Sequence, residues 1–126
     1  MTIRWEGVGA VFLALAVMLG AFGAHGLRES LSSTEMAVYE KAVFYHFIHG
    51  LGLLCIPQFV TNGLMSVRHS NQICLLHSIG ITVFSGSLYL YSNTGEKIFA
   101  MVTPFGGTAF ILGWGLLGWR VLRRSD

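Results

Sequence analysis

Histidine is the residue of this sequence best suited to chemistry, and four of the five histidines lie in or beside long apolar stretches. His46 and His49 are three residues apart, so a helix would place both on one face. His25 ends one apolar stretch and His77 lies near the start of another. Because histidine titrates near neutral pH and ligates transition metals, these positions are candidates for proton handling or metal binding.

Depth in a bilayer limits which of these histidines can meet. Counted from the predicted start of the second span, His46 and His49 lie roughly 6–10 Å below the outer edge, whereas His77 lies roughly 6 Å from the opposite edge. In a hydrocarbon core about 30 Å thick, His77 is therefore expected to lie too far from the other two to share a haem. His25, His46 and His49 remain candidates for a metal site near the outer surface, and the alternative is interface anchoring by hydrogen bonds.

Hydroxyl groups form a second set of candidates. Ser85, Ser87 and Tyr89 lie in the predicted outer half of the third span, and Thr103 precedes Pro104 in the fourth. Such hydroxyls commonly bond to carbonyls of their own helix or to a neighbouring helix. The alternative is that they form the polar lining of a small-ligand site.

No catalytic constellation is visible in the sequence. Serine-nucleophile, phosphate-loop and zinc-protease motifs are absent. The apolar stretches also lack a central Asp, Glu, Lys or Arg, which argues against an antiporter built on one buried carboxylate. We therefore expect a protein that is not an enzyme and that carries no cofactor.

The composition is that of an integral membrane protein. Hydrophobic residues make up 53% of the 126 residues and charged residues 11%, whereas soluble domains have about 25% charged residues. No basic stripe with interleaved aromatics points to nucleic acid. We predict an all-α fold, a membrane four-helix bundle that forms one integral membrane domain over residues 1–126, with spans at about 8–24, 42–60, 73–90 and 98–121.

Two local signals bear on the helix boundaries. Ser32 and Glu35 have the spacing of a capping box, which predicts a helix that begins near Ser33 and enters the membrane later. Pro104 leaves two alternatives for the last span, because proline is tolerated in a first helical turn and kinks a helix interior.

Positive charges predict the orientation. The N-terminus, the second loop and the C-terminus would share one side, which carries Arg4, Arg68, Arg120, Arg123 and Arg124. The opposite side carries Arg28, Lys41 and Lys97. Five against three favours both termini in the cytoplasm.

Small residues recur at helical spacing. Ala16, Gly20 and Ala24 are four residues apart, and the last span holds several more glycines. Such spacing lets helices approach closely. It predicts packing within the bundle, and a homodimer face is the alternative.

Four short motifs, in order along the chain, resemble those of a known family. They are Gly20-Ala-Phe-Gly-Ala-His25-Gly-Leu27, Tyr45-His46-Phe47-Ile48-His49, Phe84-Ser-Gly-Ser-Leu-Tyr89, and Thr103-Pro-Phe-Gly-Gly107 followed by Gly113-Trp114. In these motifs the chain resembles the YgdD-like inner-membrane proteins, a bacterial family defined by a domain of unknown function, with four transmembrane helices. The resemblance implies a four-span fold in the cell inner (plasma) membrane and implies no activity. His25 and His49 match the family pattern better than His46, where the family often has glutamine.

The topology places all four motifs in the outer half of the bundle. There a polar pocket is expected from His25, Tyr45, His49, Ser85, Ser87, Tyr89 and Thr103, and tight packing of helix ends is the alternative. The leading hypothesis is a non-enzymatic accessory or structural protein of the lipid bilayer, in a homo-oligomer or a larger membrane complex. The alternatives are a small-ligand, metal or quinone-type binding site, or a small oligomeric transporter.

Overall fold

The computed structural model describes residues 3–123, and within that range every regular element is a helix. The elements are α1 (Trp5–Phe22), the π-helix η1 (Gly23–Leu27), α2 (Ser33–Cys55), α3 (Gln58–Thr61), α4 (Val67–Gly80), the π-helix η2 (Ile81–Ser85), α5 (Gly86–Thr94) and α6 (Lys97–Leu122). They join into four spans of 23, 29, 28 and 26 residues, each long and apolar enough to cross a membrane. The predicted all-α fold with four transmembrane helices is confirmed.

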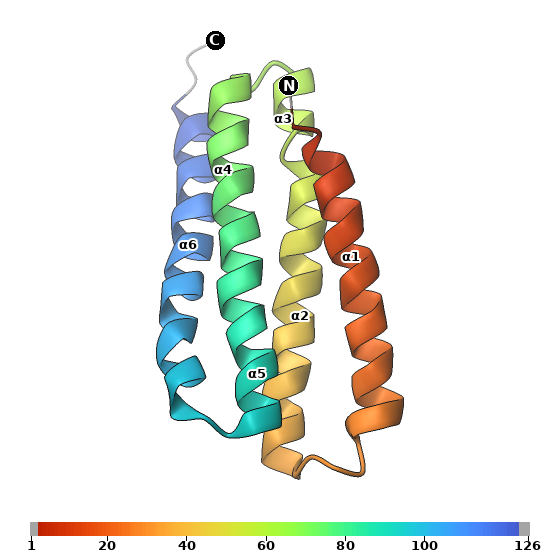
Figure 1. Ribbon diagram of the computed structural model, residues 1–126. Coiled ribbons are helices and arrows are strands. Elements are labelled where there is room, and N and C mark those ends of the chain that lie inside the picture. The colour runs from red at the N-terminus through yellow and green to blue at the C-terminus, as the bar shows by residue number, and fades with distance from the viewer. Residues whose placement is uncertain (1–2, 124–126) are drawn as a thin grey trace.

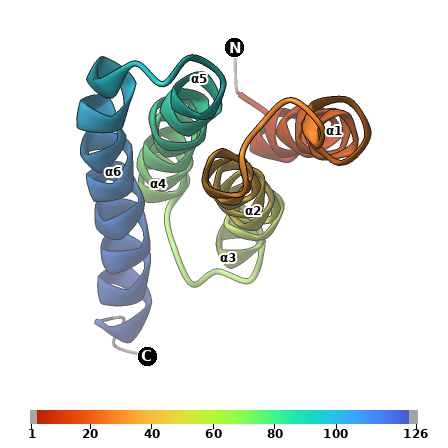
Figure 2. The same cartoon turned by 90° about the horizontal axis from the view of Figure 1, so that it is seen from below.

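The four spans run antiparallel, and both ends of the described chain lie at the same end of the bundle (Figure 1). Viewed along the bundle, α1 and α6 lie at opposite edges, with α2 and the α4–α5 span between them (Figure 2). α1 packs against α2, and α6 packs against α4, η2 and α5. At the start of α1, Trp5 Nε1 donates a hydrogen bond of 2.8 Å to Asn71 Oδ1 of α4. The large apolar side chains left exposed on the edge helices suit contact with lipid.

The expected capping box is present at the start of α2. Ser32 Oγ accepts from the backbone N–H of Glu35, and the Glu35 carboxylate accepts from the backbone N–H of Ser32. Both bonds satisfy donors that a helix start leaves unpaired, so the prediction of a helix beginning near Ser33 is confirmed. Pro104 lies inside α6, which begins at Lys97. The last span therefore continues through the proline and does not start at it.

The small residues of α1 serve packing within the bundle, as predicted. Ala16 is fully buried. A Cβ on Gly20 would lie 3.4 Å from Val43, and one on Gly23 would overlap the ring of Tyr39. Close approach of this kind lets dispersion act between helix backbones where the lipid offers no hydrophobic driving force. α1 is thus held to α2 along most of its length.

A second close contact fixes α6 against the third span. A Cβ on Gly106 would lie 2.7 Å from Phe84 Cα, so the backbone of η2 occupies the space that any other residue would need. One turn further along α6 the sizes are reversed, because the Phe110 ring fills the space beside Gly80. Glycine and aromatic residues therefore alternate across the contact, which we call the α6 seam.

Gly106→Ala is expected to lower the free energy of unfolding by about 1–3 kcal/mol, because the new methyl meets backbone that cannot move aside cheaply. Gly107→Ala is the matched control. A Cβ there lies 3.6 Å from the Phe84 ring, so that variant should be unchanged or gain up to about 1 kcal/mol from better helix propensity. Unfolding in detergent, followed by circular dichroism, measures both. Equal stability of the two variants would contradict the α6 seam.

Candidate functional site

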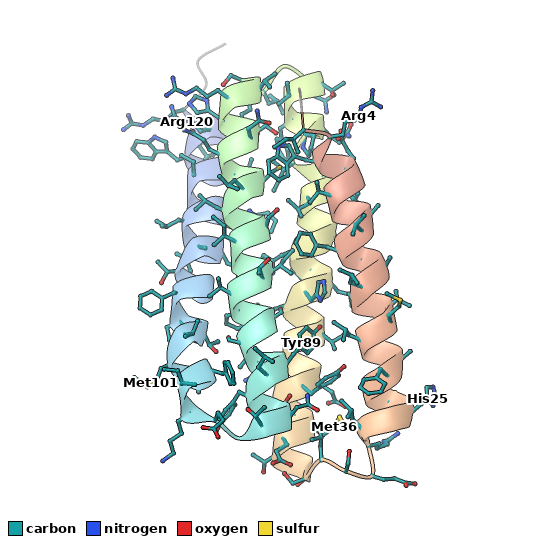
Figure 3. All side chains as sticks on the ribbon, viewed as in Figure 1. Arg4, His25, Met36, Tyr89, Met101 and Arg120 are labelled. Atoms are coloured by element: carbon teal, nitrogen blue, oxygen red, sulfur yellow. The ribbon has the colours of Figure 1, made fainter. Side chains whose placement is uncertain are left out.

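The predicted outer pocket does not form around all seven of its candidate residues. His25 lies in η1 at the outer edge of the bundle, where its side chain is exposed and directed away from the other helices (Figure 3). Tyr45 is half-buried; its ring stacks on His49 with centroids 5.8 Å apart and packs at a tilt against Phe84 with centroids 4.5 Å apart. His25 therefore stands apart from Tyr45 and His49.

The hydroxyl candidates are engaged in contacts between helices. Ser85 Oγ donates to the Ala42 carbonyl across the α2 interface at 2.8 Å, and the serine is fully buried. Ser87 Oγ and Thr103 Oγ1 are 2.6 Å apart and join α5 to α6. These bonds agree with the first of the two alternatives for the hydroxyl groups, in which the hydroxyls bond to carbonyls or to a neighbouring helix.

Tyr89 extends this pattern to a histidine. Its hydroxyl, on α5, lies 3.0 Å from Nδ1 of His46 on α2, and the His46 side chain is buried. The Phe12 ring of α1 covers His46 edge-on, with centroids 5.8 Å apart. His46 is therefore separate from His25, and its own Nε2 is buried with no hydrogen-bond partner among residues 3–123. Within residues 3–123 no group of three or more His, Cys, Asp or Glu side chains is arranged to hold a metal ion.

The structure instead brings His49 of α2 together with His77 of α4, whose ring centroids are 5.6 Å apart. The expectation that His77 lies too far from His49 is wrong. It counted His49 from a predicted membrane edge near residue 42, although α2 begins at Ser33. Measured from the helix starts, His49 lies about 24 Å along its span and His77 about 15 Å along the antiparallel neighbour. The two helices start at opposite ends of the bundle, so two residues lie at the same level when these distances add up to the span length. Their sum nearly equals the span length of about 40 Å.

Each ring of this histidine pair is oriented by its own helix. His49 Nδ1 lies 2.7 Å from the Tyr45 carbonyl, and His77 Nδ1 lies 2.8 Å from the Ile73 carbonyl, four residues earlier in each case. A carbonyl only accepts hydrogen bonds, so Nδ1 carries the proton and Nε2 of the neutral ring holds a free lone pair. His77 is fully buried, and its Nε2 has no hydrogen-bond partner among residues 3–123.

Aromatic rings of α6 enclose the pair. Phe110 stacks on His49 with centroids 3.4 Å apart and an interplanar angle of 13°. Trp114 presents its edge to His77 at 4.6 Å. Between them, Gly113 makes room for the imidazole, because a Cβ there would lie 2.6 Å from His77 Cε1. This packing encloses the two imidazole rings and buries the Nε2 atom of His77.

His77 is the residue that sequence reasoning undervalued. The useful signal was Gly113, because a glycine that faces a bulky side chain across an antiparallel helix pair marks where that side chain is accommodated. The glycine content of the last span was visible in the sequence. Its pairing with His77 required the register between α4 and α6.

Comparison with known proteins identifies the family. The family model described as "Protein of unknown function (DUF423)" matches residues 19–107. A UPF0382 membrane protein of Staphylococcus saprophyticus is 44% identical over 110 residues, which cover 87% of this chain and 89% of the relative. The UPF0382 membrane protein YwdK of Bacillus subtilis is 41% identical over 107 residues, covering 85% of this chain and 86% of the relative.

No solved structure matches this chain. The family match runs from the end of α1 to the first part of α6, and so includes both members of the histidine pair. The biochemical role of the family is uncharacterised. With four apolar helices of membrane-spanning length and relatives named as membrane proteins, this chain is a multi-pass membrane protein that belongs to the DUF423 family.

Proposed function

We propose that this chain is a non-enzymatic membrane protein that binds a small ligand at the histidine pair, either a transition-metal ion or a molecule that donates a hydrogen bond. The observation that carries this proposal is the buried Nε2 of His77, which has no partner among residues 3–123, together with the His49 ring, whose centroid lies 5.6 Å from that of His77. A buried acceptor without a donor costs about 1–3 kcal/mol. A ligand that supplies the donor or the metal would recover that cost.

The protonation of the pair selects the class of ligand. Both Nδ1–H groups are taken up by carbonyls, so the neutral rings offer two lone pairs and no free donor. Such a pair accepts from a hydroxyl or an N–H, or coordinates a metal, but does not donate to a quinone carbonyl. Histidines that bind metals commonly have the same Nδ1–H bond to a backbone carbonyl, which orients the ring.

The surroundings support binding in preference to catalysis. The rings that contact His49 and His77 are those of Tyr45, Phe110 and Trp114. None of these aromatic side chains is an activated nucleophile or a carboxylate base of the kind that acid–base or covalent catalysis uses. Two imidazoles alone would leave a bound metal with open positions, which a second, exogenous ligand would fill.

Loss of His77 Nε2 is expected to abolish ligand retention. In a Cys55→Ser background, which removes the exposed thiol, the purified protein should retain Zn²⁺ or Cu⁺ after gel filtration, or yield a bound small molecule on extraction. His77→Asn keeps an amide near the Nδ1 position and removes Nε2, so it should lose both. Elemental analysis and mass spectrometry of extracts make the measurement.

His25→Ala is the control, because His25 is exposed and remote from the pair; it should behave like the parent protein. Nitrogen-15 NMR of the imidazoles should show the Nε2 resonance of His77 shift when the ligand is bound. Equal metal and equal extracts in the parent protein and in His77→Asn, with an unshifted Nε2 resonance, would refute the proposal.

A second candidate function is that of an accessory subunit in a homo-oligomer or larger membrane complex. The observation that favours it is a shallow, mainly apolar groove of about 560 Å³ on α1, lined by Gly7, Val11 and Leu15 among others. A Cβ on Gly7 would meet nothing within 4 Å, so this surface has room for another helix. α1 lies at the edge of the bundle, where a partner has access (Figure 2).

Gly7→Leu should weaken this association by filling the groove without disturbing the fold. Gly118→Leu is the matched control, because a Cβ there also meets nothing within 4 Å but lies on α6. Chemical crosslinking in native membranes should give a larger species that Gly7→Leu reduces several-fold and Gly118→Leu leaves intact. The absence of any crosslinked species at native expression would count against the accessory role.

We also infer that the membrane is the cell inner (plasma) membrane, as the resemblance to YgdD-like proteins implies, and that both termini lie in the cytoplasm. Arg4 and Arg120 lie at one end of the bundle, and His25 and Met101 lie at the other (Figure 3). The end with Arg4 and Arg120 is the one predicted to be cytoplasmic, because arginines near span ends are retained on that side. Arg124, the fifth positive residue in that prediction, lies outside the described residues.

Cysteine labelling tests the orientation. In a Cys55→Ser background, Ser30→Cys in the loop after η1 should react with a membrane-impermeant maleimide in intact cells. Asn62→Cys, after α3 at the opposite end, should react only once the membrane is opened. Both positions are exposed, so access depends on the side of the membrane. The reverse pattern would overturn the inferred orientation.

A further inference from the structure

A basic pocket of about 530 Å³ lies at the end of the bundle where the described chain begins and ends. It opens between the turn that follows α3, the first turn of α4 and the last turns of α6. Arg120, Arg123 and Trp119 line it from α6, and His69 lines it from α4. Residues from two helices and a loop, distant in sequence, thus converge on one concave surface.

The lining carries an excess of positive charge. Among residues 3–123 it includes two guanidinium groups and an imidazole, and it includes no carboxylate. The planar guanidinium presents paired N–H donors that match two oxygens of a phosphate. The Arg123 guanidinium lies 3.7 Å from the centroid of the Trp119 ring, a cation–π contact that restricts its motion. The chemistry of the pocket is therefore that of a phosphate receptor.

The first turn of α4 adds to this attraction. Ser66 lies at its N-cap and receives the backbone N–H of His69 at 3.4 Å. Because the amino end of a helix carries partial positive charge, it attracts an anion, as the two arginines do. The arginines supply the full charges, and the helix end adds a smaller contribution.

Apolar surface continues from the pocket along α6 into the membrane. Trp119 is 52% exposed and Leu122 is 86% exposed, as expected for anchors at a membrane interface. Leu112, Gly115 and Trp119 follow each other at spacings of three and four residues, so they share one helix face. A Cβ on Gly115 would meet nothing within 4 Å, so the space on this face between the two larger side chains is open.

We propose that this pocket binds the phosphate of an anionic phospholipid, with one acyl chain lying along the face of α6 that carries Leu112, Gly115 and Trp119. A lipid satisfies both halves of the surface at once, because its phosphate meets the arginines and its chain meets the exposed apolar face. Free phosphate would use only the first half. An anionic lipid is preferred over a zwitterionic one, because the described lining residues offer no carboxylate to pair with the positive headgroup of the latter.

The test uses the full chain in nanodiscs made from a zwitterionic phospholipid with a minor fraction of phosphatidylglycerol. Native mass spectrometry of the released protein counts the lipids that stay bound. The parent protein should retain phosphatidylglycerol in excess of its share of the mixture. The double variant Arg120→Gln/Arg123→Gln should bind it about 30-fold more weakly, because each arginine near the membrane surface contributes about 1 kcal/mol.

The matched control removes the same number of charges from the same end of the bundle. Arg4→Gln/Arg68→Gln leaves the lining of the basic pocket intact and should retain the lipid at the level of the parent protein. Circular dichroism should show that both double variants keep their helix content. An equal loss in the two double variants would overturn the pocket and leave only a general surface-charge effect. Displacement of the lipid by inorganic phosphate at the concentration of the lipid would overturn the lipid assignment.

Discussion

The distance between α6 and the third span controls the interior of this protein. Gly106 and Gly113 are seven residues apart on α6 and therefore share one helix face. The first admits the backbone of Phe84 and the second admits the ring of His77. Because a lipid environment provides no hydrophobic force between helices, such close contacts decide where a helix settles. A larger residue at either glycine would move α6 outward, together with the aromatic rings that enclose the histidine pair.

The polar groups of the interior depend on the same spacing. Ser87 of α5 and Thr103 of α6 meet at 2.6 Å, and Phe110 of α6 stacks on His49 of α2 at 3.4 Å between centroids. α6 thus reaches α2 through side chains, although the helices that it packs against directly are those of the third span. The π-helix η2 places Ser85 where it bonds to α2 across the interface. Irregular turns of this kind often occur at functional sites.

The sequence predicted the elements of this fold better than the way their faces meet. Hydropathy predicted four apolar spans and the capping box at Ser32 predicted one helix start, because both signals act within a single helix. The position of His25 was beyond such reasoning, since η1 adds a π turn that rotates the following residues away from α-helical positions. The nearness of His49 and His77 depended on where each helix begins, and an apolar stretch does not mark the polar first turns of α2.

The energetics of the contact between His77 and Gly113 bear on whether the histidine pair is only structural. An apolar side chain at position 77, with alanine at position 113, would pack the same interface without a buried polar atom. The chain instead has a glycine at 113, which is a weaker helix former than alanine by about 1 kcal/mol, and it buries an imidazole whose Nε2 has no partner among residues 3–123. Both features reduce stability, and helix packing alone requires neither. The ligand that we propose at Nε2 would account for both, because it needs the imidazole and the imidazole needs the space beside Gly113.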